Sequence, residues 1–180
     1  MTTDIVILAA GKGTRMQSAI PKVLHPLAGK PMLAHVLAAA DSVPQANKIV
    51  VTGHGATEVE KATADSGSTF VQQTEQLGTA HAVQMAVPYL REEARVLILY
   101  GDVPLIRPTT IDRLLTAVCD TTISLLTIQL DDPMGYGRIV RNAAGEIESI
   151  IEQKDASPDQ LKFTEVNTGV LAIGARQLMD

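Results

Sequence analysis

A glycine-rich turn with several cations follows the first apolar segment of this chain. Residues 4–10 are Asp-Ile-Val-Ile-Leu-Ala-Ala, residues 11–16 are Gly-Lys-Gly-Thr-Arg-Met, and Pro-Lys follows at 21–22. Glycine lets backbone N–H groups approach phosphate oxygens, and the cations supply charge. We therefore expect a polyphosphate site in which Arg15 clamps the β- and γ-phosphates and Lys22 lies near the α-phosphate. The alternative is a solvated turn with incidental cations.

The turn matches neither of the two common phosphate fingerprints. No Lys-Ser/Thr pair stands where G-x-x-x-x-G-K-[ST] requires one, and Met16 occupies the last glycine position of G-x-G-x-x-G. The spacing therefore predicts a nucleotide enzyme whose phosphate-binding loop belongs to neither of these two types.

A carboxylate follows another apolar segment. Residues 97–105 are Leu-Ile-Leu-Tyr-Gly-Asp-Val-Pro-Leu, so Asp102 comes directly after a predicted strand. Mg²⁺ prefers one or two carboxylates together with phosphate oxygens and water. Asp102 is therefore a candidate metal ligand, although an ordinary turn or helix-capping aspartate has the same local pattern.

A polar segment before a predicted helix offers groups for a base. Residues 72–80 are Gln-Gln-Thr-Glu-Gln-Leu-Gly-Thr-Ala. A pyrimidine needs donors and acceptors at fixed angles, which a Gln amide and a backbone N–H provide. The alternative is simple capping of the helix, to which Thr79 contributes.

The later part of the chain carries polar groups that suit sugar hydroxyls. These are Glu152 with Lys154 and the sequence Asn-Thr-Gly at 167–169, although exposed strand faces have the same composition. Gly135 and Gly137 indicate close backbone approach to a ligand or a β-bulge. The two aspartates at 131–132 precede a proline, which favours a solvated turn over a second metal site.

Apolar segments alternate with helical patterns in the elements that must position these groups. Strands are expected at 5–9, 48–52, 69–72, 95–100, 122–129, 137–141, 147–152 and 166–173, with apolar helical stripes at 33–40 and 82–89. This order predicts an α/β fold: a Rossmann-like, mainly parallel sheet flanked by helices on both faces. Residues 138–152 predict a late antiparallel hairpin.

Composition narrows the possible functions. The 180 residues are 46% hydrophobic with a net charge of −5, which is typical of one soluble globular domain and argues against nucleic-acid or membrane-surface binding. No signal peptide or membrane span is apparent, so we expect a cytoplasmic protein. The single cysteine, Cys119, excludes an intramolecular disulfide and is expected to be buried. The four histidines lack metal-ligand spacing and are expected to be structural or solvated.

Seven ordered motifs resemble the sugar-nucleotide pyrophosphorylases. They are LAAGKGTRM from 8, PKVLH from 21, LAGKPM from 27, QTEQLGTAHA from 73, YGDVPL from 100, DDPMGYGRI from 131 and IEQKDA from 151. Together they look like the N-terminal uridyltransferase domain of the bifunctional bacterial N-acetylglucosamine-1-phosphate uridyltransferase/glucosamine-1-phosphate acetyltransferase family. That resemblance implies a nucleotide-diphospho-sugar transferase fold over residues 1–180.

The resemblance also implies a role for each matching residue. Arg15 and Lys22 would be catalytic and bind phosphates, and Asp102 would bind substrate and hold Mg²⁺. The uridine would be held by Leu8, Ala9, Ala10, Gly11, Gln73, Gly78 and Thr79. The N-acetylglucosamine site would be lined by Tyr100, Gly101, Gly137, Glu152 and Asn167.

The implied reaction joins UTP and N-acetylglucosamine-1-phosphate into UDP-N-acetylglucosamine and pyrophosphate, for cell-wall precursor synthesis. The family's first domain continues past position 180 and supplies a second Mg²⁺ ligand, an Asn, from that later segment. A β-helix carries acetyltransfer and trimerisation. We therefore expect a truncated domain without the acetyltransferase part, monomeric where the full-length protein is a homotrimer, and poorly active. The alternatives are transfer to another sugar-1-phosphate, or a non-catalytic nucleotide-sugar binding module.

Overall fold

The computed structural model describes residues 2–13, 16, 18–119 and 121–179, which divide into two compact units. The first unit comprises residues up to 124 together with 171–180, and the second comprises residues 125–170. Arg15, one of the predicted catalytic residues, lies outside the described residues.

A mainly parallel sheet forms the centre of the first unit. Its strands are β1 (Thr3–Ala9), β4 (Asn47–Thr52), β5 (Thr69–Gln72) and β6 (Arg95–Tyr100), in the spatial order β5-β4-β1-β6. The end of β10 (Glu165–Gly174) pairs antiparallel with β6, with Leu171 opposite Ile98. The first strand is buried along its whole length, as expected of a central strand covered on both faces.

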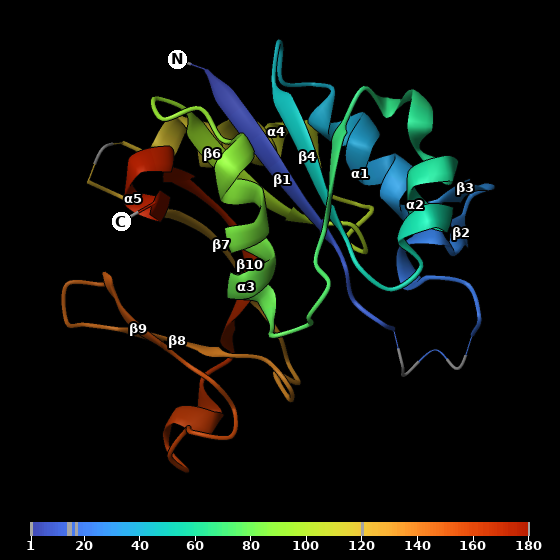
Figure 1. Cartoon of the computed structure of the whole chain (residues 1–180). Coiled ribbons are helices and arrows are strands. Elements are labelled where there is room, and N and C mark those ends of the chain that lie inside the picture. The colour runs from blue at the N-terminus through green and yellow to red at the C-terminus, as the bar shows by residue number, and fades with distance from the viewer. Residues whose placement is uncertain (1, 14–15, 17, 120, 180) are drawn as a thin grey trace. The chain divides into compact units, whose positions relative to one another are not determined.

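Helices cover both faces of this sheet, which confirms the predicted fold class. The helices are α1 (Met32–Ala40), α2 (Ala56–Ala62), α3 (Thr79–Ala86), α4 (Pro108–Ala117) and α5 (Ala175–Met179). Helix α3 contacts β1 and β4, whereas α4 contacts β6 and α1; Figure 1 shows α3 in front of the sheet and α4 behind it. Successive side chains of β1 point to opposite faces of the sheet, so this strand packs against helices on both faces. Val6 belongs to the apolar cluster beneath α3, and its neighbours Ile5 and Ile7 are fully buried on the other face.

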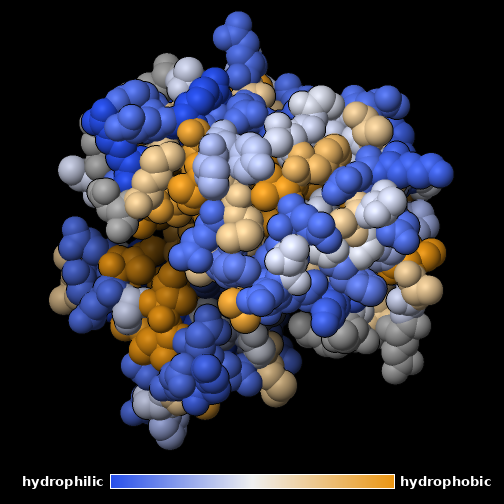
Figure 2. Space-filling model, viewed as in Figure 1, coloured by the Kyte–Doolittle hydropathy of each residue, from blue (hydrophilic) through white to orange (hydrophobic). Residues whose placement is uncertain are grey.

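Short elements complete the first unit. A small separate antiparallel sheet joins β2 (Pro26–Leu27) to β3 (Lys30–Pro31), and 3-10 turns occupy Lys22–Leu24, Ala64–Ser66 and Val87–Tyr89. Within the described residues, no helix is long and apolar enough to cross a membrane. Most of the face shown in Figure 2 is covered by hydrophilic side chains.

The second unit is antiparallel. It contains β7 (Ser124–Gln129) from its second residue on, β8 (Arg138–Arg141), β9 (Ile147–Ile151), the first part of β10 and a 3-10 turn at Gln160–Lys162. The predicted hairpin is confirmed: β8 pairs antiparallel with β9, Ile139 lies opposite Ile150, and the register shifts between Val140 and Arg141. Strand β10 pairs with β8 through Val166 and Arg138, and β7 also pairs with β10.

The prediction for Cys119 was wrong. Helix α4 ends at Ala117 because Val118 takes an extended conformation, φ −83° and ψ 137°, which leaves Cys119 exposed. The Cys119 Sγ lies 3.1 Å from the Thr122 Oγ1. That contact, with further hydrogen bonds from Thr121, lowers the pKa of the Cys119 thiol to about 7.

Candidate active site

One pocket of the first unit collects most of the residues that the sequence singled out there. It has a volume of about 260 Å³ and opens where β1 ends. Parallel strands bring their carboxyl ends to the same edge of a sheet, which is where open α/β sheets bind ligands. The lining residues are Leu8, Ala9, Ala10, Gly11, Lys22, Val23, Gln73, Gln76, Gly78, Thr79, Ala82, Tyr100 and Asp102.

The turn after β1 forms one wall of this pocket. Apart from Gly11 itself and its two neighbours in the chain, no described atom lies within 4 Å of the position that a Cβ on Gly11 would take, so the backbone there is open to a ligand. The Ala10 carbonyl accepts a hydrogen bond of 3.0 Å from the Gln76 Nε2. The two walls of the pocket are thereby tied together by residues 66 positions apart in the sequence.

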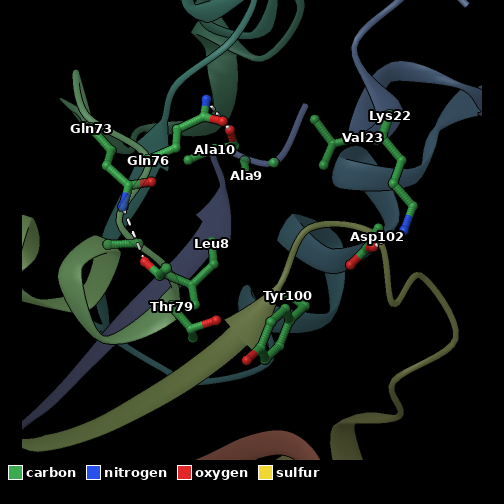
Figure 3. A pocket seen from close by; sticks show the side chains of 13 residues that line it. Leu8, Ala9, Ala10, Lys22, Val23, Gln73, Gln76, Thr79, Tyr100 and Asp102 are labelled. Atoms are coloured by element: carbon green, nitrogen blue, oxygen red, sulfur yellow. Dashed lines mark hydrogen bonds and ion pairs between the residues drawn. The ribbon is translucent and has the colours of Figure 1, made fainter. Parts of the chain in front are cut away.

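The opposite wall carries the Gln73 amide. Gln73 follows β5 directly and is 4% exposed, and its backbone N–H donates to the Thr52 carbonyl at 2.7 Å. Its side-chain Nε2 donates to the Gly78 carbonyl at 3.1 Å and lies 3.1 Å from the His81 Nδ1. In Figure 3 a dashed line joins this nitrogen to the Gly78 carbonyl oxygen, and the amide oxygen points toward the side where Leu8 and Ala9 lie.

Thr79 and Tyr100 border the same pocket. Gly78 takes a positive φ of 105° directly before α3, which a residue with a side chain rarely adopts, and Thr79 begins the helix. Burial and the nearby Asp102 carboxylate raise the pKa of Tyr100, and a hydrogen bond with the Thr79 side chain opposes this rise. Tyr100 is therefore a neutral phenol at pH 7, able both to donate and to accept a hydrogen bond.

A cation and a carboxylate meet at the far side of the pocket. The Lys22 Nζ forms an ion pair with the Asp102 Oδ2, and their side chains are 40% and 25% exposed. Asp102 is held by the turn after β6, where the Gly101 N–H donates to the Leu8 carbonyl at 2.9 Å. Both groups remain accessible enough to exchange this pairing for a ligand.

The donor set at Asp102 fits a divalent cation that is shared with a substrate. Asp102 offers one carboxylate at the mouth of the pocket, and among the described residues no group of three or more His, Cys, Asp or Glu side chains gathers around any point. A site with one protein carboxylate suits Mg²⁺ when phosphate oxygens and water complete the shell. It does not suit a structural metal, which would need a closed set of protein ligands.

The second unit brings together three residues predicted for the sugar. The Asn167 backbone N–H donates to the Gly137 carbonyl at 2.9 Å, and a Cβ on Gly137 would lie 3.3 Å from the Glu152 Oε1. The Asn167 Oδ1 accepts from the Gly169 N–H at 2.8 Å. Arg138 supports this region, since its buried side chain donates to the Pro133 carbonyl at 2.7 Å.

The two aspartates before this region form the expected turn. Asp131 and Asp132 are exposed, and the Asp132 Oδ1 accepts from the Met134 N–H at 3.1 Å. This side chain-to-backbone contact is the usual role of an aspartate that begins a turn.

Sequence reasoning missed several residues of the pocket, and one residue behind it that contacts Gln73. Val23 and Ala82 line the pocket because of their position in the fold, and their apolar side chains give no indication in the sequence of a binding role. Gln76 lies in the motif that supplied Gln73 but was not selected. His81 was expected to be structural or solvated, and its contact with Gln73 depends on the packing of α3 against β5. Because His81 stands eight residues after Gln73, no local sequence pattern predicts the contact between them.

Comparison with known families gives one match that covers most of the chain. The model of the MobA-like NTP transferase domain matches residues 5–157. Curated relatives are similar over nearly all of the chain: the bifunctional protein GlmU of Burkholderia vietnamiensis is 55% identical over 175 residues, and that of Stutzerimonas stutzeri is 57% identical over 173. These alignments cover 97% and 96% of the chain but only 39% and 38% of the relatives. The chain thus spans about two fifths of their length, and the resemblance predicted from the motifs is confirmed.

Solved structures share the fold at low sequence identity. A nucleotidyl transferase from Methanothermobacter superposes with a TM-score of 0.71 at 24% identity, covering 99% of this chain and 74% of that one. A CMP:2-keto-3-deoxy-manno-octonic acid synthetase solved with CTP has a TM-score of 0.74 at 20% identity, covering 99% of this chain and 76% of that one. These similarities establish the fold.

Proposed function

The chain belongs to the MobA-like NTP transferase domain family, and from this membership together with the seven sequence motifs we propose that it transfers a uridylyl group from UTP to N-acetylglucosamine-1-phosphate. The products are UDP-N-acetylglucosamine and pyrophosphate. The observation that carries the proposal is a single pocket in which the Gln73 amide faces the Lys22–Asp102 pair across the end of β1. A cytoplasmic location is part of the proposal and is supported by the lone, unpaired Cys119.

The pocket offers one set of groups for each part of UTP. The Gln73 oxygen and the backbone around Gly78 suit the base, and the open backbone at Gly11 suits the phosphates. Lys22 supplies a cation that lies at the pocket wall, and Asp102 supplies the carboxylate. The predicted partner cation Arg15 belongs to the same proposal.

The chemistry requires charge neutralisation more than proton transfer. A phosphate oxygen of the sugar-1-phosphate forms a bond to the α-phosphorus of UTP while the bond from that phosphorus to pyrophosphate breaks. The attacking phosphate is already ionised at neutral pH, so the residues must hold two anions in line and offset their repulsion. Lys22 does this by leaving Asp102 and pairing with a phosphate. A divalent cation held by Asp102 would supply Lewis-acid stabilisation of phosphate charge when bound.

The assignment of the sugar to Gly137, Glu152 and Asn167 is a separate part of the proposal. Among the described residues, the Asn167 amide oxygen is engaged by Gly169, while its N–H₂ group makes no protein hydrogen bond. That group is free to donate to a sugar substituent. Asn167→Ala is therefore expected to raise the KM for N-acetylglucosamine-1-phosphate and to leave the KM for UTP unchanged.

The test measures UDP-N-acetylglucosamine and pyrophosphate together, with magnesium present. Lys22→Ala is expected to lower kcat/KM by about 10²- to 10³-fold, because one preorganised charge of the site is lost. Lys61→Ala, which removes an exposed cation from the last turn of α2, is the matched control and should have no effect. Equal activity of both variants would refute the role of Lys22.

Asp102→Asn tests the role of Asp102 in metal binding separately from nucleotide binding. In the absence of divalent cations, UTP is expected to bind this variant at least as tightly as the wild type, because Lys22 is released and a negative charge is removed. Magnesium should then fail to improve binding or turnover. A variant that still responds to magnesium like the wild type would exclude Asp102 as the metal-holding group.

Two further experiments address the alternatives. Glucose-1-phosphate tested in place of N-acetylglucosamine-1-phosphate distinguishes transfer to another sugar, which would show an equal or higher kcat/KM. A non-catalytic binding module predicts UTP binding without any pyrophosphate release in either case.

A further inference from the structure

The two hydrogen atoms of the Gln73 amide are both directed at protein acceptors. The Nε2 lies 3.1 Å from the Gly78 carbonyl oxygen and 3.1 Å from the His81 Nδ1. A carbonyl oxygen only accepts hydrogen bonds, so the side of the amide that faces Gly78 must be the N–H₂ group. This contact shows which end of the amide is the N–H₂ group without any assumption about the proton on His81.

The same geometry determines which nitrogen of His81 carries a proton. An amide N–H₂ group cannot accept, so the His81 Nδ1 must accept from it, and the ring proton resides on Nε2. His81 stands in the first turn of α3, on the helix that Gly78 precedes. The Gly78 carbonyl and the His81 imidazole, both at the N-terminal end of α3, therefore both accept hydrogen bonds from the amide nitrogen.

This orientation leaves the Gln73 amide oxygen facing the pocket. Gln73 is 4% exposed, and its oxygen points toward the side of the pocket where Leu8 and Ala9 lie. In the described part of the chain, no protein donor is bonded to that oxygen. An oriented acceptor in a confined pocket favours a base edge that presents an N–H, such as N3–H of uracil, and disfavours the bare N3 of cytosine.

We infer that His81 is a positioning residue, which holds the Gln73 amide oxygen toward the pocket and so makes the base site select uracil over cytosine. The inference rests on the proposed function, since it concerns the base subsite of the same pocket. Without His81, only the Gly78 contact restrains the amide, which can then turn and present its N–H₂ group to cytosine.

The experiment measures equilibrium binding of UTP and CTP to the full chain by calorimetry. In His81→Leu, which keeps a side chain of similar size without an acceptor, the UTP-over-CTP preference is expected to fall about tenfold. His81→Asn places an oxygen near the position of Nδ1 and should restore most of it. If the His81→Leu protein unfolds, His81→Ala serves as the second variant without an acceptor, because alanine has the highest helix propensity.

A merely structural role of His81 would weaken both nucleotides equally and leave their ratio unchanged, which would overturn the inference. A double-mutant cycle with Gln73→Met gives the second readout. Because His81 acts through Gln73, His81→Leu should have no effect on the ratio once Gln73 is replaced. An equal loss in both backgrounds would also overturn the inference.

The outcome for the wild type separates this inference from the function on which it rests. A wild-type chain that binds UTP and CTP equally refutes uridine selection and the proposed function with it. A wild-type preference that survives unchanged in His81→Leu refutes the positioning role alone.

Discussion

Gly53→Ala is expected to destabilise the protein and to distort the nucleotide pocket together. Gly53 follows β4, next to Ala10, which follows β1, and the two strands are in register up to Ala9 and Thr52. A Cβ on Gly53 would lie 2.7 Å from the Ala10 oxygen, 2.9 Å from its Cβ and 3.0 Å from its Cα. Non-bonded carbon atoms normally approach to about 3.5–4.0 Å, so one backbone must move by roughly half an ångström or more.

The cost follows from where those atoms lie. Two of the three are backbone atoms of a chain anchored in the sheet, and overpacking of this kind costs about 1–3 kcal/mol. For a chain of this length that corresponds to a Tm lower by roughly 2–12 °C. The displaced Ala10 carbonyl is also the acceptor of the Gln76 hydrogen bond. Losing it, at about 1 kcal/mol, should weaken UTP binding roughly fivefold.

Thermal unfolding and UTP calorimetry measure the two effects separately. Gly11→Ala is the matched control, because its new Cβ has no described atom within 4 Å apart from its chain neighbours, and its φ is not positive. Its Tm should equal that of the wild type, while the Cβ in the open pocket weakens UTP binding. A Gly53→Ala protein with wild-type Tm and wild-type affinity would refute the steric reasoning.

Three other predictions concern groups away from the pocket. Arg91→Ala should lower the free energy of unfolding in urea by about 3 kcal/mol, because Asp4 is fully buried and loses the guanidinium that donates to it at 2.7 Å; a loss under 1 kcal/mol would contradict this. Arg141 lowers the pKa of Glu165 to about 2, below its ordinary value of 4.5, so the stabilisation from Glu165 is complete above pH 4.5 and disappears as the pH falls toward 2. The Tm of the wild type should therefore fall more steeply over that range than the Tm of Glu165→Gln, and parallel curves would exclude the pairing. Alkylation of Cys119 by iodoacetamide should be half-maximal near pH 7 rather than at 8.5 or above, in keeping with its lowered pKa.

The positions of strands and turns could be predicted from the sequence because they depend on neighbouring residues. Apolar runs such as residues 5–9 and 95–100 are strands in the structure, and the glycines after residue 10 end the first one. Parallel strands share a carboxyl edge, and in the structure the residues after β1 and β6, including Asp102, lie in one pocket at that edge. Cys119 shows the limit of this reasoning, since one extended residue after α4 changed a buried position into an exposed one.

The contacts that give the pocket its chemistry depended on tertiary structure. Gln76 reaches Ala10 across 66 residues, Lys22 pairs with Asp102, and the Gln73 amide takes its orientation from Gly78 and His81. Periodicity and turn preference act over a few residues, whereas these contacts follow from the order β5-β4-β1-β6 and from the packing of α3 on it. Sequence therefore determined which chemical groups the site contains. The packing of the sheet and helices decided which of them face one another, because a hydrogen bond requires a distance and an angle that only the folded chain provides.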